Sequence, residues 1–190
     1  MSHIIGESYK SLAEESIEMK TKELVIMSLL AAMGAVLHTI FPPIFFGMKP
    51  DMMLVMMFLS IILFPKVQHV VVIALVTGVI SALTTGFPGG QIPNMIDKPV
   101  TAFIFLALFF TCQKVKNKVV ITAVLTAIGT IVSGVIFLSA ALLITGLPAA
   151  LPALLVGVVL PAAVINTIAM VFVFPIAQSI LKRARMIEVA

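Results

Sequence analysis

The chain has 190 residues, of which 61% are hydrophobic and only 11% are charged. Soluble globular domains average about 45–50% apolar and about 25% charged residues, so this composition excludes a soluble protein and predicts an integral membrane protein. The apolar blocks lack the alternating polarity of barrel strands, which predicts an all-α membrane bundle. A formal net charge of +4 does not indicate a nucleic-acid partner, because the basic residues lie between apolar blocks.

The first apolar block is preceded by an acidic stretch. Residues 1–18 contain four glutamates and one lysine. A secretory signal would have a basic start and would precede a soluble chain, whereas here further apolar blocks follow. We therefore predict a cytoplasmic N-terminal extension at residues 1–20 and a membrane domain at residues 21–190.

Six apolar segments are predicted as the helices of this domain. They cover residues 23–41, 51–64, 68–85, 98–113, 119–145 and 152–180. A full crossing needs about 20 residues, and the second segment, with about 14, spans only about 21 Å. We expect that segment to be a short helix, one extended by loop residues, or a partly re-entrant one.

The basic residues orient these helices. With six helices, nine Lys or Arg residues fall on one side of the membrane: Lys20, Lys22, Lys66, Lys114, Lys116, Lys118, Lys182, Arg183 and Arg185. The opposite side has only Lys49 and Lys98, each close to an aspartate. Because Lys and Arg concentrate in cytoplasmic loops, both termini are predicted to be cytoplasmic.

Three loops on the outer side are rich in proline, glycine and polar residues. They cover residues 41–51, 84–99 and 145–152. A membrane tolerates irregular backbone and charge only where protein or a water-filled cavity shields them, so the loops predict a solute site near one face. The alternative is that glycine and proline simply end three helices, and this alternative is strongest for the uncharged third loop.

Two pairs of opposite charge lie in these loops. Lys49 and Asp51 flank one proline, and Asp97 and Lys98 precede another. Each aspartate could cap the N-terminus of the following helix, with the lysine neutralising it. Alternatively, the lysines could bind the carboxylate and the aspartates the ammonium group of a zwitterion such as an amino acid.

Aromatic and amide side chains surround the charges. Phe45, Phe46 and Phe87 could pack an aromatic ring, and burying about 200 Å² would contribute roughly 5 kcal/mol. A directional contact to the ring, such as one to an indole N–H, would then provide selectivity. The candidates for it are His38, Gln91 and Asn94. Asn166 is expected to form an interhelical hydrogen bond.

Signatures of enzymes are absent from the sequence. It contains no Gly-Lys pair, hence no P-loop, and no motif of a metalloprotease or serine hydrolase. Cys112 is alone and is predicted to be a small buried hydrophobic residue. We predict no catalytic residue, cofactor or metal.

The first predicted helix contains a small-residue pattern. Ala31 and Ala35 are four residues apart, a spacing that lets another helix approach closely. With six helices and no ATPase motif, the chain resembles the S-components of energy-coupling factor (ECF) transporters, and most of all their tryptophan-specific family. The resemblance is carried by TKELVIMSLLAAMGAVLHTIFPPIFFGMKPDM (Thr21 to Met52) and LTTGFPGGQIPNMIDKPVTAF (Leu83 to Phe103).

The resemblance implies a specific function. It implies a high-affinity L-tryptophan-binding subunit in the bacterial cytoplasmic membrane, which docks on a transmembrane coupling subunit driven by two cytoplasmic ATPases. Ala31 and Ala35 match the family's motif for contact with the coupling subunit, and the three outer loops would close over the solute. The extension before Met19 departs from the family pattern.

Two other functions fit the sequence. A stand-alone, ion-coupled secondary transporter of an aromatic solute would need a titratable or ion-coordinating group deep in the membrane, for which only His38 and Asn166 are candidates. In a membrane assembly protein, the polar loop residues would only cap helices.

Overall fold

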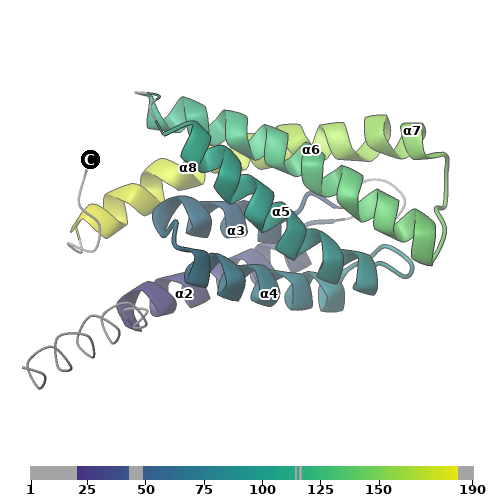
Figure 1. Cartoon of the computed structure of the whole chain (residues 1–190), viewed down its shortest axis with the longest axis horizontal. Coiled ribbons are helices and arrows are strands. Elements are labelled where there is room, and N and C mark those ends of the chain that lie inside the picture. Colours follow the sequence, from purple (N-terminus) through teal and green to yellow (C-terminus); the bar gives the residue numbers. More distant parts are fainter. Residues whose placement is uncertain (1–20, 43–48, 114, 116, 184–190) are drawn as a thin grey trace, which may run out of the picture.

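The computed structural model describes residues 21–42, 49–113, 115 and 117–183. In chain order these form α2 (Thr21–Ile40), α3 (Met52–Leu63), α4 (Val67–Thr84), α5 (Gln91–Thr111), α6 (Lys118–Ile144), α7 (Leu151–Leu154), the π-helical turn η1 (Leu155–Val159) and α8 (Leu160–Arg183). The described part contains helices and their connections and no strand, which confirms the predicted all-α bundle (Figure 1).

Among the residues that the structure describes, five helical segments are long and apolar enough to cross a membrane: α2, α4, α5, α6 and the continuous stretch Leu151–Arg183. The remaining helix, α3, has 12 residues and is about 18 Å long, too short for a full crossing. The predicted shortness of the second helix is therefore confirmed.

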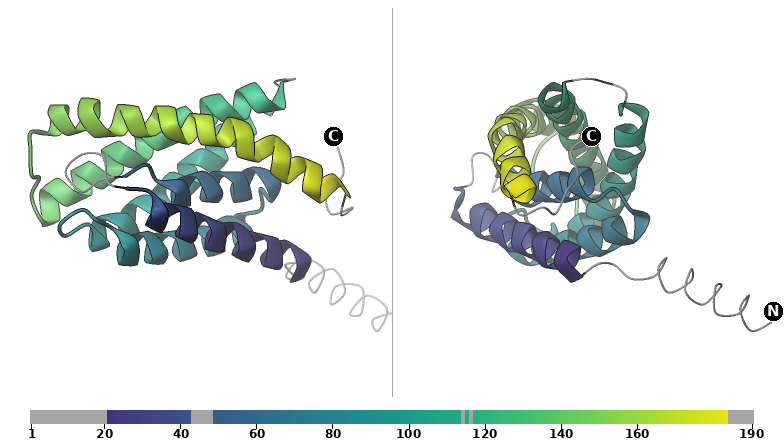
Figure 2. Two further views of the ribbon diagram at one scale, coloured as in Figure 1. Left: turned by 180° about the vertical axis from the view of Figure 1, so that it is seen from behind. Right: turned by 90° about the vertical axis from the view of Figure 1, so that its left-hand side faces the viewer.

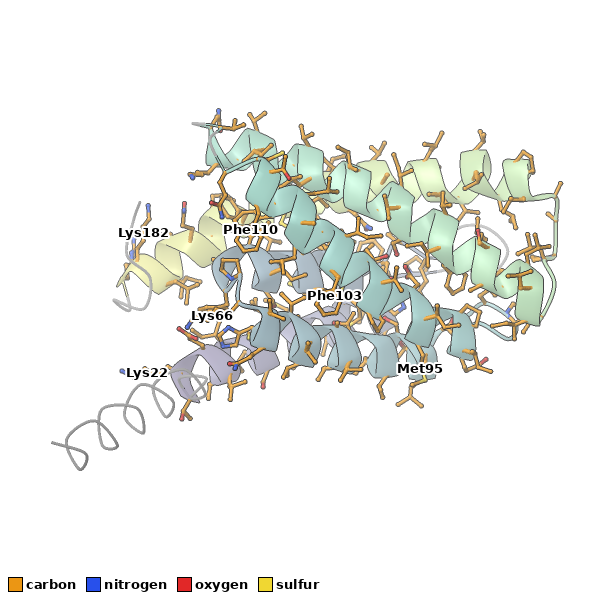
Figure 3. The ribbon with its side chains drawn as sticks, viewed as in Figure 1. Lys22, Lys66, Met95, Phe103, Phe110 and Lys182 are labelled. Atoms are coloured by element: carbon orange, nitrogen blue, oxygen red, sulfur yellow. The ribbon has the colours of Figure 1, made fainter. Side chains whose placement is uncertain are left out.

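Basic side chains from distant parts of the sequence lie at one end of the bundle. Lys22 of α2, Lys66 before α4 and Lys182 of α8 are together there, whereas Met95 of α5 lies toward the opposite end (Figure 3). Because Lys and Arg concentrate on the cytoplasmic side of membrane proteins, this end is the one predicted to face the cytoplasm. We call it the basic end.

The short helix α3 forms the centre of the bundle. It contacts α2, α4, α5, α6 and α8, and the end-on view in Figure 2 shows the longer helices arranged around it. Every residue from Met52 to Ile61 is buried, because α3 packs against longer helices around it. Phe58 of α3 stacks on Phe105 of α5 with ring centroids 4.0 Å apart, and Gly129 of α6 leaves the space that these rings fill.

The fourth predicted helix begins seven residues earlier than expected. We predicted a start at residue 98, but α5 begins at Gln91 and includes both Pro93 and Pro99. Pro93 is the third residue of the helix. Proline is tolerated there, because the N–H groups of the first helical turn form no intrahelical hydrogen bond. Asp97 and Lys98 therefore lie inside a membrane helix, and the prediction that they stand at a helix start is wrong.

The last segment contains an irregular turn. Within η1 the helix widens, and the N–H of Leu160 donates to the carbonyl of Leu155, five residues back. Pro161 follows directly; its ring has no N–H and hinders a regular turn at the preceding residues. The irregular turn places Val158 and Val159 beside a cavity, described next.

Candidate functional site

A cavity that is partly open to solvent lies among the helices of the bundle, with about 650 Å³ of empty space when the open part is included. Its lining comes from α2, α3, α5, α6, η1, α8 and the connections before α3 and α5: His38, Lys49, Asp51, Leu54, Thr85, Gly86, Phe87, Asn94, Asp97, Lys98, Thr130, Ser133, Gly134, Phe137, Leu138, Val158, Val159, Ala162 and Asn166.

One lysine joins the two aspartates of the cavity. Lys98 Nζ donates to Asp51 Oδ2 over 2.5 Å and to Asp97 Oδ2 over 2.8 Å. The Lys98 side chain is only 2% exposed and that of Asp97 is fully buried. A buried ammonium is tolerated when carboxylates surround it, so each of these three groups makes the burial of the others possible.

Asp97 has hydrogen-bond donors on both of its oxygens. Oδ1 accepts from the Thr101 hydroxyl at 2.7 Å, and Oδ2 accepts from the Ser133 hydroxyl at 2.8 Å in addition to Lys98. These contacts tie α5 to α6. A carboxylate with this many donors is held firmly in place and has little capacity left for a ligand.

Asp51 is more accessible than Asp97. Its side chain is 20% exposed, and Oδ1 caps α3 by accepting from the Leu54 N–H at 3.0 Å. The capping contact, which is one of the two roles that the sequence suggests for Asp51, is therefore observed. His38 Nδ1 lies 3.6 Å from the same oxygen, and Lys49 Nζ donates to the His38 carbonyl over 3.0 Å. The half-buried Lys49 and Asp51 thus place opposite charges at the cavity wall.

The structure brings most of the predicted site residues together. Those that line the cavity are His38, Lys49, Asp51, Phe87, Asn94, Asp97 and Lys98. Gln91 is exposed and does not line it. Phe45 and Phe46 lie outside the described residues. Of the two expected local pairs, Asp97 and Lys98 do bind each other, but Lys98 also binds Asp51, 47 positions away, and Lys49 donates to the His38 carbonyl.

Two of the three loops that are predicted to face outward contribute to this cavity, and the third lies against one of them. Lys49 and Asp51 come from the first loop, and Thr85, Gly86 and Phe87 from the second. The Phe87 ring packs edge-on against Phe137 of α6, with centroids 5.3 Å apart. A Cβ at Gly89 would collide with the side chain of Thr145, where the third loop begins, and Gly89 adopts a φ of 72° that favours glycine.

The sequence reasoning missed the contribution of α6. Thr130, Ser133, Gly134 and Phe137 all line the cavity. A signal was present, because Thr122, Thr126, Thr130 and Ser133 recur at helical spacing in an otherwise apolar segment, and all four are buried. Such a stripe of small polar residues marks the face that a membrane helix turns toward its neighbours.

The two alanines of the predicted partner motif differ in exposure. Ala31 is 4% exposed and belongs to the hydrophobic core of the chain itself, whereas Ala35 is half-buried. Ser28 and Ala32 are the exposed small residues of α2. The surface of α2 that another helix could approach is therefore displaced by about one residue from the predicted one.

Comparison with known proteins identifies close relatives. The family model described as "Tryptophan transporter TrpP" matches residues 20–182. A protein of Bacillus subtilis (strain 168), named "Probable tryptophan transport protein", is 63% identical over 172 residues, which cover 90% of this chain and 99% of the relative.

Two clostridial proteins with the same name are also similar. The one from Clostridium acetobutylicum is 45% identical over 161 residues, covering 83% of this chain and 92% of the relative. The one from Clostridium perfringens (strain 13 / Type A) is 36% identical over 183 residues, covering 90% of this chain and 100% of the relative. No solved structure matches the chain.

Proposed function

This chain belongs to the tryptophan transporter TrpP family, and from that premise we propose that it is the membrane-embedded subunit that captures L-tryptophan for uptake. It is a multi-pass bacterial membrane protein and not an enzyme. The observation that carries the proposal is the cavity itself, in which buried opposite charges adjoin an apolar and aromatic wall. A free amino acid with an aromatic side chain matches this cavity, because it has two opposite charges at one end and an apolar ring at the other.

The charged residues divide into two groups by accessibility. Asp51, which is partly exposed, is the proposed partner of the ligand's ammonium group, and Lys49 of its carboxylate. Lys98 holds Asp51 in position and is itself bound by Asp97, whereas Lys49 is positioned by its hydrogen bond to the His38 carbonyl. Charge-assisted hydrogen bonds at both ends of the zwitterion select for a free amino acid over indole.

The ring of the ligand would occupy the apolar part of the cavity. Phe87 and Phe137 form an aromatic corner, and Val158 and Val159 of η1 provide an aliphatic wall. Burying about 200 Å² of aromatic surface is worth roughly 5 kcal/mol. This contribution drives binding, and the polar groups determine which aromatic solute binds.

Ligand binding tests the proposal directly. The purified chain in lipid nanodiscs is titrated with tryptophan, indole, tyrosine and biotin by calorimetry. We expect tryptophan to bind most tightly, indole and tyrosine to bind more weakly, and biotin not to bind. Equal affinity across the four compounds, or no binding of tryptophan, would overturn the assignment.

We further propose that uptake is driven by the ATPases of an ECF transporter through a membrane coupling subunit. The sequence contains no P-loop, so ATP hydrolysis would have to come from a partner. Support for docking comes from α2, whose exposed face combines the small residues Ser28 and Ala32 with the half-buried Ala35.

Matched substitutions on α2 test this docking. Ala32→Leu should weaken copurification with the coupling subunit while tryptophan binding persists, because Ala32 is exposed. Ala31→Leu should instead destabilise the chain, because Ala31 is packed in its core. Copurification unaffected by Ala32→Leu would exclude this face of α2 as the docking surface.

One observation favours the alternative of a stand-alone, ion-coupled transporter. Asp97 is fully buried inside α5, so the membrane domain contains the deep titratable group that this alternative needs. Uptake of labelled tryptophan by the chain alone in proteoliposomes, abolished by an uncoupler, would establish it. Uptake that requires the ATPases would support the ECF proposal.

A further inference from the structure

We propose that Asn166 recognises the ring N–H of the bound tryptophan through its side-chain oxygen Oδ1. Asn166 lies on α8, where the sequence predicts only an interhelical hydrogen bond, and it lines the cavity. The inference rests on the proposed function, because it assigns a residue that selects among ligands of the same cavity.

The oxygen of Asn166 is an unused acceptor. The residue is fully buried, and its Nδ2 donates to Thr130 Oγ1 of α6 over 3.3 Å. Within the part of the chain that the structure describes, Oδ1 has no hydrogen-bond partner. Buried polar atoms are nearly always paired, and an unpaired one beside a binding cavity is satisfied when a ligand brings a donor.

Two other polar side chains of the cavity donate to partners within the protein. The Ser133 hydroxyl donates to Asp97, and the Asn94 amide donates to the carbonyl of Gly90 in its own helix. His38 Nδ1 also has no hydrogen bond, but it lies 3.6 Å from Asp51, among the charges that suit the ligand's head group. Asn166 Oδ1 is thus the unpaired acceptor on the α8 side of the cavity.

The positions of these groups fit the shape of an aromatic amino acid. Ser133, beside Asp97, and Thr130, beside Asn166, are three residues apart on α6, a rise of about 4.5 Å along the helix. The charged cluster and the amide are therefore separate but close along one wall. A ligand whose charged head group and ring nitrogen are joined by a short carbon linker spans this separation.

The chemistry of the ring nitrogen explains why an acceptor is needed. The indole N–H donates a hydrogen bond and cannot accept one. A site that presents a buried acceptor rejects an analogue without the donor, because the acceptor then stays unpaired. Phenylalanine and tyrosine place no donor at this position of the ring, so Asn166 would also favour tryptophan over them.

The test compares tryptophan with its benzothiophene analogue, in which sulfur replaces the ring N–H. Both ligands are titrated against the full chain in nanodiscs, as wild type and as Asn166→Leu. We expect the wild type to prefer tryptophan by about tenfold or more, and the variant to lose most of this preference through weaker tryptophan binding. Thr167→Val is the control, because Thr167 neighbours Asn166 on α8 but bonds only to Ala163 of its own helix; it should keep the preference.

Each outcome decides the inference. A wild type that binds both ligands equally, or an Asn166→Leu variant that keeps the preference, would overturn it while leaving tryptophan binding intact. If Asn166→Leu does not fold, the smaller Asn166→Ala variant, which also removes the acceptor, is measured instead. A wild type that binds neither ligand would overturn the proposed function and this inference with it.

Discussion

Two ionic clusters lie in different environments of the bundle. The cavity cluster comprises Asp51, Asp97 and Lys98, and the basic-end cluster comprises Glu23, Lys66 and His69. In each cluster, one group contacts two partners. In the cavity, the Lys98 ammonium binds both aspartates. At the basic end, Glu23 Oε2 lies 3.3 Å from Lys66 Nζ and 3.1 Å from His69 Nε2. They differ in exposure, because the Lys98 side chain is 2% exposed and that of Lys66 is 58% exposed.

The difference in exposure separates two uses of charge. At the basic end, water and salt screen the exposed Lys66, so its pair with Glu23 is weak, although Glu23 and His69 are themselves largely buried. In the cavity, removing one partner leaves another buried and uncompensated, so the cluster is strongly coupled to the fold. The cavity cluster also keeps Asp51 at the cavity wall with a fixed orientation, which a flexible surface pair cannot do.

The largest effect is expected for Lys98→Met. This change leaves Asp51 and Asp97 close together without their shared counter-ion, which should lower the free energy of unfolding by about 3–5 kcal/mol. Thermal unfolding of the protein in nanodiscs measures the loss, as a clear fall in the midpoint temperature. Tryptophan binding should be lost as well, because Asp51 would no longer be held in place.

Lys182→Met is the matched control for this change. Lys182 is exposed at the end of α8, so the same substitution should leave the midpoint almost unchanged. Equal midpoints for Lys98→Met and Lys182→Met would show that the cavity cluster contributes little to stability, contrary to the comparison of the two clusters.

A smaller effect, on binding more than on folding, is expected for Asp51→Asn. The amide oxygen can still cap α3, but the negative charge proposed to bind the ligand's ammonium group is lost. Tryptophan affinity should fall by about 2–5 kcal/mol, whereas indole, which has no ammonium group, should bind as before. Calorimetric titration of both ligands measures the two effects.

The contrast between the two ligands makes this prediction decisive. A parallel loss of tryptophan and indole affinity would mean that Asp51 acts only by maintaining the shape of the cavity. Lys98 keeps Asp97 as its partner in this variant, so folding should be affected less than by Lys98→Met.

The sequence predicts the helices better than it predicts the cavity. Apolar block lengths and the distribution of Lys and Arg place the ends of most helices within two or three residues of those observed. The start of α5 was missed because Pro93, Asp97 and Pro99 are typical of a loop, and only tertiary packing makes a buried helix of them. Local pattern therefore determines where apolar helices lie but not how deeply a charge is buried.

Pairing across the bundle could not be predicted from the sequence. The bond from Lys98 to Asp51 joins residues 47 positions apart, and the one from Ser133 to Asp97 joins residues 36 apart. Neighbouring residues of opposite sign suggested two local pairs; only Asp97 and Lys98 form one, and Asp51 before α3 and Ser133 of α6 are further, distant partners. The unpaired oxygen of Asn166 could not be predicted either. It follows from the structure, in which the amide nitrogen of Asn166 donates to Thr130 and the oxygen has no partner.

The smallest effect is expected for Lys66→Met at the basic end. The Lys66 side chain is 58% exposed, so its pair with Glu23 should contribute less than about 1 kcal/mol to the free energy of unfolding. High salt should reduce even this contribution, because the screening length falls to about 3 Å at 1 M. Midpoint temperatures of wild type and variant at low and high salt measure it, and we expect the midpoints of the two proteins to converge as salt increases.

A loss as large as that of Lys98→Met, persisting at high salt, would mean that Glu23 and the buried His69 depend on Lys66 as strongly as the aspartates depend on Lys98. Exposure would then not be what separates the two clusters.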